Sequence, residues 1–291
     1  MQTDSDEIKA VGVGVKHIVV ATDFSEEGQR AVEFAVVLAK PAGATVTMVH
    51  VAAEAGRDFT DAHDRLEAQS LRLKRLHGAS TQIATAIGLP ASRLIGLCRD
   101  RQADLVVIAA SSKTTLQKWL LGSTATQLLR RSPVPVLVVG PGMRPEINSI
   151  VVGCAYTSQC AAAYRAADQI GAAFGASIEV VHVSSDPGEV EIMAGTEGVR
   201  SQRTEEIKLA SWCARELPDP RCKLVARHLV SEGPGRTLAD HATSMGADLI
   251  ALGSHDRGFL SRVRNPVTGE VVLENVYCGL LSVRVPTPTL V

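Results

Sequence analysis

Small and hydroxyl-bearing residues between positions 104 and 124 have the composition of an anion-binding loop. The stretch begins with the apolar run LVVI, continues through the small polar residues AASSKTT, and ends at Gly122, Ser123 and Thr124, where an apolar helical pattern begins. α/β proteins hold phosphate on a strand, a small-residue loop and a helix start, because free backbone N–H groups and the positive helix end face the anion. The loop is poor in glycine, with Ala109 and Ser112 where a phosphate loop favours Gly. We therefore expect this loop to bind phosphate, and we expect Ala109 and Ser112 to weaken that binding.

Asp23 is a second candidate, because it directly follows the apolar run HIVVAT at residues 17–22. Ser25 is a favourable helix N-cap, and Glu26 and Glu27 place negative charge in the first helical turn, where the macrodipole favours it. Asp23 is therefore either a turn or capping residue at a strand end, or a carboxylate that contacts a ligand.

Other reactive side chains have simpler interpretations. His50 and His182 lie at equivalent places in apolar strands, and we interpret both as structural histidines. His255 and Asp256 have no partner nucleophile, so a solvated loop is the better interpretation for them. The six cysteines form no CxxC pair and no cluster with histidine at metal-ligand spacing, which favours reduced thiols over a zinc site.

The composition describes a balanced, soluble protein. Of the 291 residues, 45% are hydrophobic and only 3% aromatic, and the formal net charge is −1. There is no basic stripe for nucleic acid, and few aromatic rings are available to stack on bases. No apolar run approaches the roughly 20 residues of a membrane helix, and the polar N-terminal stretch lacks the apolar segment of a secretion signal. We therefore expect a cytoplasmic protein that binds neither nucleic acid nor membrane.

Strand-like and helix-like segments alternate along the first half of the chain. Apolar runs typical of buried strands lie at residues 17–22, 45–51, 81–86, 104–108 and 133–139. Helical patterns lie between them, and the stretch from Pro41 to Gly43 is expected to stop the first helix. In the second helix Leu66, Leu73 and Leu76 are expected to form the apolar stripe. This alternation predicts right-handed crossovers and a parallel sheet covered by helices on both faces.

The second half of the chain repeats the first. Residues 151–183 align with residues 19–51 at an offset of 132, and residues 247–255 align with residues 103–111 at an offset of 144. The offsets differ by 12 residues, which places an insertion near residues 184–199. With GPGMRP at 140–145 as linker, we expect an N-terminal domain at residues 15–141 and a C-terminal domain at residues 147–291. A period this long indicates a duplicated domain.

Both halves resemble the universal stress protein family, and the resemblance covers nearly the whole chain. It rests on motifs of the first copy in this order: VVATDFSEEGQRAVEFA, TVTMVHV, GLPASRLIGLCRDRQADLVVI and LLGSTATQLLRRSPVPVLVV. The resemblance implies two tandem Rossmann-like (adenine nucleotide alpha hydrolase-like) α/β domains, each a five-stranded parallel sheet with strand order 3-2-1-4-5 flanked by helices. It also implies a nucleotide site, because nucleotide-binding members hold ATP with an Asp after the first strand and a Gly-x-x-Gly-x9-Gly-Ser loop after the fourth.

The first copy keeps the spacing of that site and part of its chemistry. Asp23 matches the family's Asp, and positions 109, 112 and 122 match the loop glycines, of which only Gly122 is a glycine. If position 109 or 112 needs a positive φ, Ala or Ser costs about 1 kcal/mol there, which weakens a site without abolishing it. The implied adenine-nucleotide site consists of Ala21, Thr22, Asp23, Val51, Ala109, Ser112, Lys113, Gly122, Ser123 and Thr124.

The second copy departs further from the pattern. Ala155 stands at the Asp position, and the loop positions are Gly253, Asp256 and Pro266, followed by Val267 in place of Ser. Asp256 places a negative charge where phosphate would bind, Pro266 lacks an N–H donor, and Val267 lacks a hydroxyl. We therefore expect this copy to be structural.

These observations lead to a main hypothesis and an alternative. The main hypothesis is a cytoplasmic stress-response protein whose N-terminal copy binds ATP or AMP as a regulatory module, with Mg²⁺ arriving with the phosphates. At most slow ATP hydrolysis is expected, because the sequence offers no convincing general base and no Walker-type magnesium site. The alternative is a nucleotide-independent stress or scaffold protein that acts through protein–protein contacts, which the substitutions at positions 109 and 112 favour.

The fifth strands, at residues 134–139 and 280–285, are apolar and would each end a sheet, where an exposed edge invites pairing. In the family, fifth strands pair across a dimer, so the resemblance implies an intramolecular pseudo-dimer, and two such chains can form a homodimer. A third option, an electron-transfer flavoprotein-like or synthetase-like relative, rests on the fold alone. The lack of an SGGxDS-type pyrophosphate loop argues against the synthetase.

Overall fold

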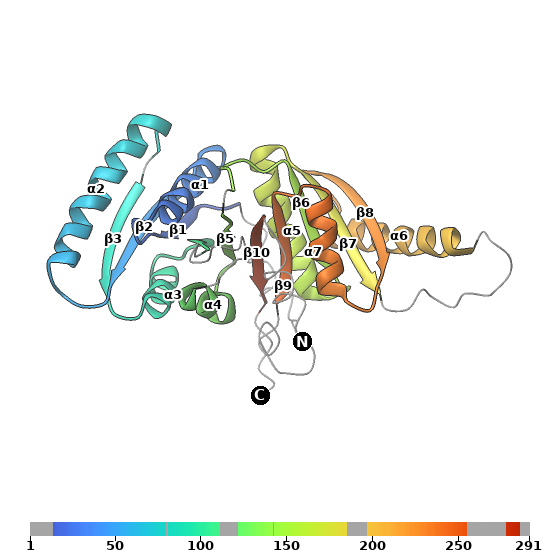
Figure 1. Cartoon of the computed structure of the whole chain (residues 1–291). Helices are drawn as coiled ribbons and strands as arrows, with labels where there is room; N and C mark the ends of the chain where they lie inside the picture. Colours follow the sequence, from blue (N-terminus) through green and yellow to red (C-terminus); the bar gives the residue numbers. More distant parts are fainter. Residues whose placement is uncertain are drawn as a thin grey trace, which may run out of the picture. The chain divides into compact units, whose positions relative to one another are not determined.

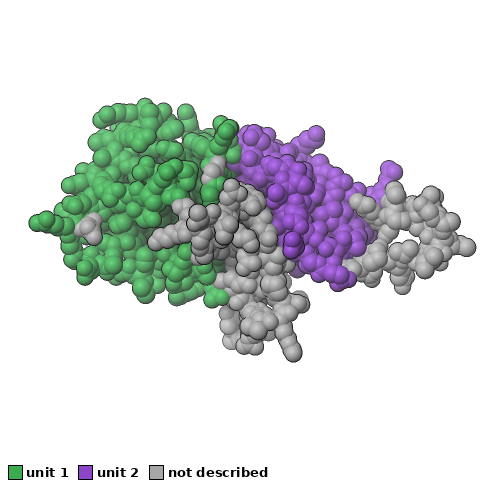
Figure 2. All heavy atoms as spheres, in the orientation of Figure 1, with its two compact units in different colours: residues 1–113, 120–146 green, residues 114–119, 147–291 purple. Residues whose placement is uncertain are grey.

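Strands and helices alternate along both halves of the chain, as the sequence predicts (Figure 1). The computed structural model describes residues 14–79, 81–110, 122–141, 143–184, 197–254 and 278–285. The chain separates into two compact units, with a boundary between Glu146 and Ile147, which Figure 2 shows in different colours.

Parallel strands form the sheet of the first unit in the order β3-β2-β1-β4-β5. These strands are β1 (His17–Ala21), β2 (Thr45–Ala52), β3 (Thr81–Ile87), β4 (Leu105–Ala109) and β5 (Val136–Val139). Apolar residues dominate them, and Ile18, Val19 and Val20 of β1 are fully buried. The strand order 3-2-1-4-5 is confirmed. Because β1 pairs with both β2 and β4, the direction in which the chain crosses the sheet reverses between β1 and β4.

Helices cover both faces of this sheet. They are α1 (Glu26–Ala42), α2 (Arg57–His77), α3 (Pro90–Asp100) and α4 (Ser123–Arg131). Right-handed crossovers place α1 and α2 on one face and α3 and α4 on the other, and the members of each pair contact one another.

One expectation for α1 and α2 is confirmed and one is wrong. The stretch from Pro41 to Gly43 ends α1, as expected: the helix continues through Pro41 to Ala42 and ends where Gly43 adopts a left-handed conformation with φ 62°. Near a helix end, proline removes only one hydrogen bond, so Gly43 sets the boundary. In α2, Leu66 and Leu73 are buried, whereas Leu76 is 62% exposed. The helical period places residue 76 about 80° around the axis from residue 66, away from the sheet.

The second unit repeats the architecture of the first. Its strands are β6 (Ser149–Cys154), β7 (Ser177–Ser184), β8 (Lys223–Val230), β9 (Leu249–Ser254) and β10 (Gly279–Arg284), parallel in the order β10-β9-β6-β7-β8. Its described helices are α5 (Ser158–Phe174), α6 (Glu197–Glu216) and α7 (Pro234–Ser244). Most of the expected insertion at residues 184–199 lies outside the described residues. In neither unit is a described helix both long and apolar enough to cross a membrane.

An aspartate before the fourth strand anchors the first strand in both units. Asp104 Oδ2 accepts hydrogen bonds from the amides of residues 16 and 17, with N–O distances of 2.8 and 2.9 Å. Asp248 Oδ2 accepts hydrogen bonds from the amides of residues 148 and 149, at 2.7 and 3.1 Å. The repeat therefore preserves side-chain contacts as well as topology.

Candidate functional site

The carboxyl ends of β1 and β4 form the candidate site of the first unit, because ligands of open α/β sheets bind where the strand order reverses. Ala21 is the last residue of β1, and Ala109 is the last residue of β4. The next residue after β1, Thr22, is buried and donates its amide to Val49 O at 2.9 Å, while Asp23 is exposed. The residues expected from the first and fourth strands therefore lie at one edge of the sheet.

Ser25 fixes the Asp23 carboxylate at this edge. The Ser25 hydroxyl and amide both donate hydrogen bonds to Asp23 Oδ1, at 2.5 and 3.0 Å. Partial burial acts to raise the pKa of Asp23, but these hydrogen bonds and the nearby His50 outweigh it, so the pKa lies below its ordinary value. The Ser25 hydroxyl also accepts a hydrogen bond from Gly28 N at 3.0 Å and so caps α1. Ser25, and not Asp23, is the cap, which leaves an ionised carboxylate at the site.

Gly28 allows α1 to begin directly against this carboxylate. A Cβ atom on residue 28 would lie 2.7 Å from Asp23 Oδ1 and 3.0 Å from Thr22 Oγ1, so that the Asp23 side chain would have to move. Gly28 is not among the predicted site residues, although a glycine three residues after the capping serine is a signal that could have identified it.

A stack of side chains that was not predicted borders Asp23. Phe24 has a left-handed backbone conformation with φ 63°, which costs an ordinary residue about 1–2 kcal/mol. Its ring stacks on His50 with a centroid distance of 4.8 Å, and the Arg65 guanidinium lies 3.9 Å from the Phe24 ring centroid. The three residues come from a turn, a strand and a helix, so no local sequence pattern links them.

His50 also ties the ends of β1 and β2 together. Its Nδ1 lies 2.9 Å from Thr22 O, and because a carbonyl oxygen only accepts, Nδ1 carries the proton. His182 makes the equivalent hydrogen bond to Cys154 O at 2.8 Å in the second unit. Both contacts agree with the structural interpretation of these histidines. Val51, which was expected to contact the nucleotide, follows His50 in β2 and is half-buried.

The first turn of α4 presents the expected phosphate donors. Gly122 is the N-cap residue, with φ −60° and ψ 158°, and no side chain caps the turn. Ser123 is exposed and Thr124 is half-buried, and the first turn contains no acidic residue. Ala109 does not have a positive φ, so the conformational cost considered for that position does not arise. Two further predicted residues, Ser112 and Lys113, lie outside the described residues.

The matching edge of the second unit differs. Ala155 has no carboxylate, and Gly253, which matches Ala109, lies very close to α5. A Cβ atom on residue 253 would be 2.3 Å from the carbonyl carbon of Gln159. The start of α5 therefore lies directly against the end of β9 and leaves no room for even a methyl group. The remaining substituted positions, Asp256, Pro266 and Val267, lie outside the described residues.

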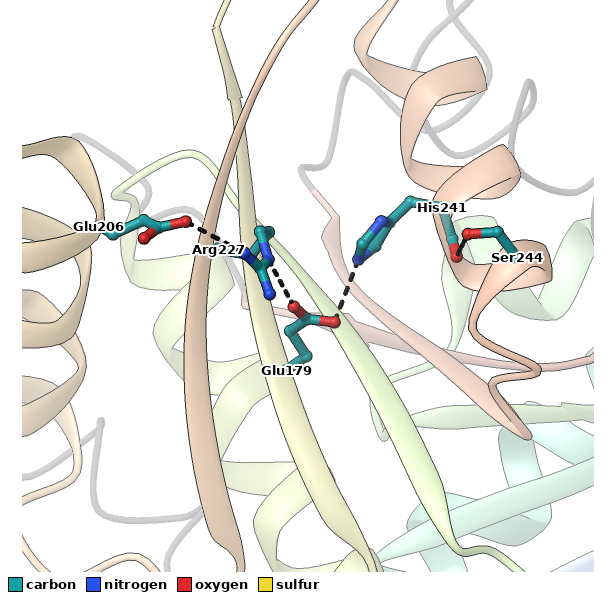
Figure 3. A network of polar contacts seen from close by, with 5 residues as sticks. All are labelled: Glu179, Glu206, Arg227, His241 and Ser244. Atoms are coloured by element: carbon teal, nitrogen blue, oxygen red, sulfur yellow. Dashed lines mark hydrogen bonds and ion pairs between the residues drawn. The ribbon is translucent and has the colours of Figure 1, made fainter. Parts of the chain in front are cut away.

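A charged network occurs elsewhere in the second unit (Figure 3). The buried Glu179 of β7 bonds to Arg227 Nε of β8 at 3.0 Å and to His241 Nε2 of α7 at 3.1 Å. Arg227 also reaches Glu206 of α6 at 3.5 Å. Because the network links two strands to two helices, we interpret it as structural. The described residues contain no group of three or more His, Cys, Asp or Glu that could hold a metal ion.

Both units match the model of one protein family. The model of the universal stress protein family matches residues 14–140 and 146–284. A universal stress protein of Mycobacterium tuberculosis (strain H37Rv) is 30% identical over 168 residues, which are 55% of this chain and 55% of that protein. This chain thus spans about half the length of that relative. A universal stress protein of Mycolicibacterium smegmatis is 26% identical over 265 residues, which are 83% of this chain and 87% of that protein.

A solved structure from this family shows the same fold. The universal stress protein from Archaeoglobus fulgidus has a TM-score of 0.64 at 15% identity, and the match covers 92% of this chain and 98% of that chain. A universal stress protein in complex with cAMP is 26% identical, with a TM-score of 0.38, and the match covers 44% of this chain and 98% of that chain.

Proposed function

Because the chain belongs to the universal stress protein family, we propose that its first unit binds an adenine nucleotide, ATP or AMP, as a regulatory module of the stress response. One observation supports this proposal best. An ionised carboxylate, Asp23, follows β1, and a helix N-terminus without a side-chain cap, at Gly122, follows the neighbouring strand β4. The same edge of one sheet thus offers an acceptor for hydroxyl groups and donors for phosphate.

The predicted residues divide between the two ends of the nucleotide. Asp23 would accept hydrogen bonds from the ribose hydroxyls or the adenine amine, with Ala21, Thr22 and Val51 beside it. The amides and hydroxyls of Ser123 and Thr124 would bind the phosphates, close to Ala109. We retain Ser112 and Lys113 as predicted phosphate contacts.

We propose a binding and sensing role with at most slow ATP hydrolysis. Among the predicted site residues that the structure describes, we identify no base positioned to activate water, and we expect Mg²⁺ to enter with the phosphates. The second unit would be structural, because Ala155 lacks the carboxylate and the start of α5 lies against Gly253. The cytoplasmic location and the pairing of the two fifth strands stay predictions.

A nucleotide-independent scaffold is the second candidate, and an exposed apolar surface on α2 favours it. Leu71 and Leu76 are 56% and 62% exposed. They line an open pocket with Ala68, Arg72 and Arg75. Such a surface suits contact with another protein.

Isothermal titration calorimetry of the full chain with ATP and with AMP tests the proposal. We expect at least one nucleotide to bind with a dissociation constant below about 1 mM, and Asp23→Asn to weaken it about tenfold by removing the charged acceptor. Asp100→Asn, at the exposed end of α3, is the matched control and should bind like the wild type. Binding no tighter than about millimolar by the wild type would contradict the proposal and favour the scaffold. Equal affinities for the wild type and Asp23→Asn would contradict the role of this carboxylate.

A further inference from the structure

A thiol takes the place of a carboxylate in the second unit. In the first unit Asp23 fills the space in front of α1, so close that a Cβ atom on Gly28 would lie 2.7 Å from Asp23 Oδ1. The matching residues of the second unit are Ala155 and Cys160, so the side chain comes from the helix instead. The Ala155 amide donates a hydrogen bond to Cys160 Sγ at 3.0 Å. In the first unit the polar atom at this place is a carboxylate oxygen of Asp23. In the second unit it is the sulfur of Cys160.

Cys154 lies beside this sulfur. It is the last residue of β6, directly before Ala155, whose amide holds Cys160 Sγ. The Tyr156 amide donates to Cys154 Sγ at 3.4 Å. Cys154 is 7% exposed and Cys160 is 6% exposed, so only a small reagent can reach them. Because successive amides of one turn, those of Ala155 and Tyr156, hold the two sulfurs, little movement is needed to bring them into a covalent bond.

The surroundings of Cys160 favour its thiolate. The Thr157 hydroxyl lies 3.1 Å from Cys160 Sγ, and Thr157 caps the helix in whose first turn Cys160 lies. The interaction with the Cys154 thiol has the largest effect, and with the other donors it outweighs burial and holds the pKa of Cys160 below the ordinary value of a thiol. The same contact, with burial, raises the pKa of Cys154. Cys160 therefore has the character of a nucleophile, and Cys154 stays protonated beside it.

We propose that Cys160 and Cys154 form a peroxide-reactive dithiol site that closes into an intramolecular disulfide. The Cys160 thiolate attacks one oxygen of hydrogen peroxide, the O–O bond breaks, and the departing hydroxide takes a proton to become water. The Cys154 sulfur then attacks the resulting sulfenic acid, so that an S–S bond forms, the S–O bond breaks and hydroxide leaves with the Cys154 proton as water. The two thiols lose the two electrons that the peroxide gains. The site is independent of nucleotide binding in the first unit.

The full chain treated with hydrogen peroxide, then alkylated and mapped by mass spectrometry, tests this site. We expect a disulfide between Cys154 and Cys160, formed at least about tenfold faster than oxidation of Cys222. Cys222 is the matched control, because it is also 7% exposed and burial raises its pKa to about 12. Between about pH 6 and pH 8 the rate at Cys160 should rise less steeply than the rate at an ordinary thiol, which gains about tenfold per pH unit.

Variants separate the two roles. Cys154→Ser should leave a sulfenic acid at Cys160 that dimedone traps, and Cys160→Ser should slow oxidation of Cys154 at least about tenfold. The comparison with Cys222 within the wild type needs no variant and so does not depend on how the variants fold. The proposal would be overturned if Cys222 and Cys160 were oxidised at the same rate, or if Cys154 paired mainly with Cys213.

Discussion

Ser25 donates two hydrogen bonds to Asp23 Oδ1 while its hydroxyl accepts the amide of Gly28, so one side chain holds both the carboxylate and the start of α1. Ser25→Ala removes the cap and the hydroxyl donor together. We expect a loss of about 1 kcal/mol in unfolding free energy, measured by urea denaturation. An unchanged unfolding midpoint would show that α1 does not depend on this cap.

The same variant makes a pH prediction. The pKa of Asp23 in the folded chain lies below its ordinary value of 3.8, so the ionised carboxylate stabilises the fold above that value, and the stabilisation is lost as pH falls through the folded pKa. Without the hydroxyl donor we expect the pKa of Asp23 to rise towards 3.8 in Ser25→Ala. Nuclear magnetic resonance titration of the Asp23 carboxyl carbon measures this shift. A pKa equal in variant and wild type would contradict the role given to the hydroxyl.

Gly28→Ala should displace the Asp23 carboxylate, because the new Cβ atom would meet its oxygen at 2.7 Å. We expect nucleotide affinity to fall about tenfold in calorimetry. Gly96→Ala is the control, since Gly96 also lies within a helix but a Cβ atom added to it would have no neighbouring atom within 4 Å. That control should stabilise the chain by about 0.5–1 kcal/mol and leave binding unchanged. If both variants bound ATP like the wild type, this result would show that close packing at Gly28 does not position Asp23.

The elements followed from the sequence because their signals are local. Apolar β-branched runs indicated the buried strands, and the repeat with its family motifs indicated the strand order in both units. The stack of Phe24 on His50 and the exchange of Asp23 for Cys160 did not follow, because each depends on residues that only the folded chain brings together. The prediction for Leu76 was wrong because leucine is a residue type that fits an apolar stripe, whereas the position of Leu76 around the helix axis does not fit it.

The buried Glu179 network should stabilise the second unit. Glu179→Gln removes the charge that faces both Arg227 and His241, and we expect a loss of about 1–3 kcal/mol, moderated because the Arg227 side chain is 41% exposed and can be hydrated. The control is Asp240→Asn at the surface pair of Arg236 and Asp240, which are 3.7 Å apart. Its cost should stay below about 0.5 kcal/mol. Equal urea midpoints for the two variants would show that the network contributes no more than a surface ion pair.

Gly253 and Ala109 occupy matching positions in the two units but should respond differently to substitution. Gly253→Ala would place a Cβ atom 2.3 Å from a backbone atom of Gln159, and because that atom cannot move without shifting α5, we expect a loss of about 2 kcal/mol or more in urea denaturation. Ala109→Gly removes a methyl group from a strand end and should cost only about 0.5–1 kcal/mol. It restores the family's glycine, yet Ala109 does not have a positive φ, so ATP affinity should change less than about twofold. A tenfold gain in affinity for Ala109→Gly would mean that the bound loop needs a conformation that alanine resists, and that the glycine pattern, and not its spacing alone, decides nucleotide binding.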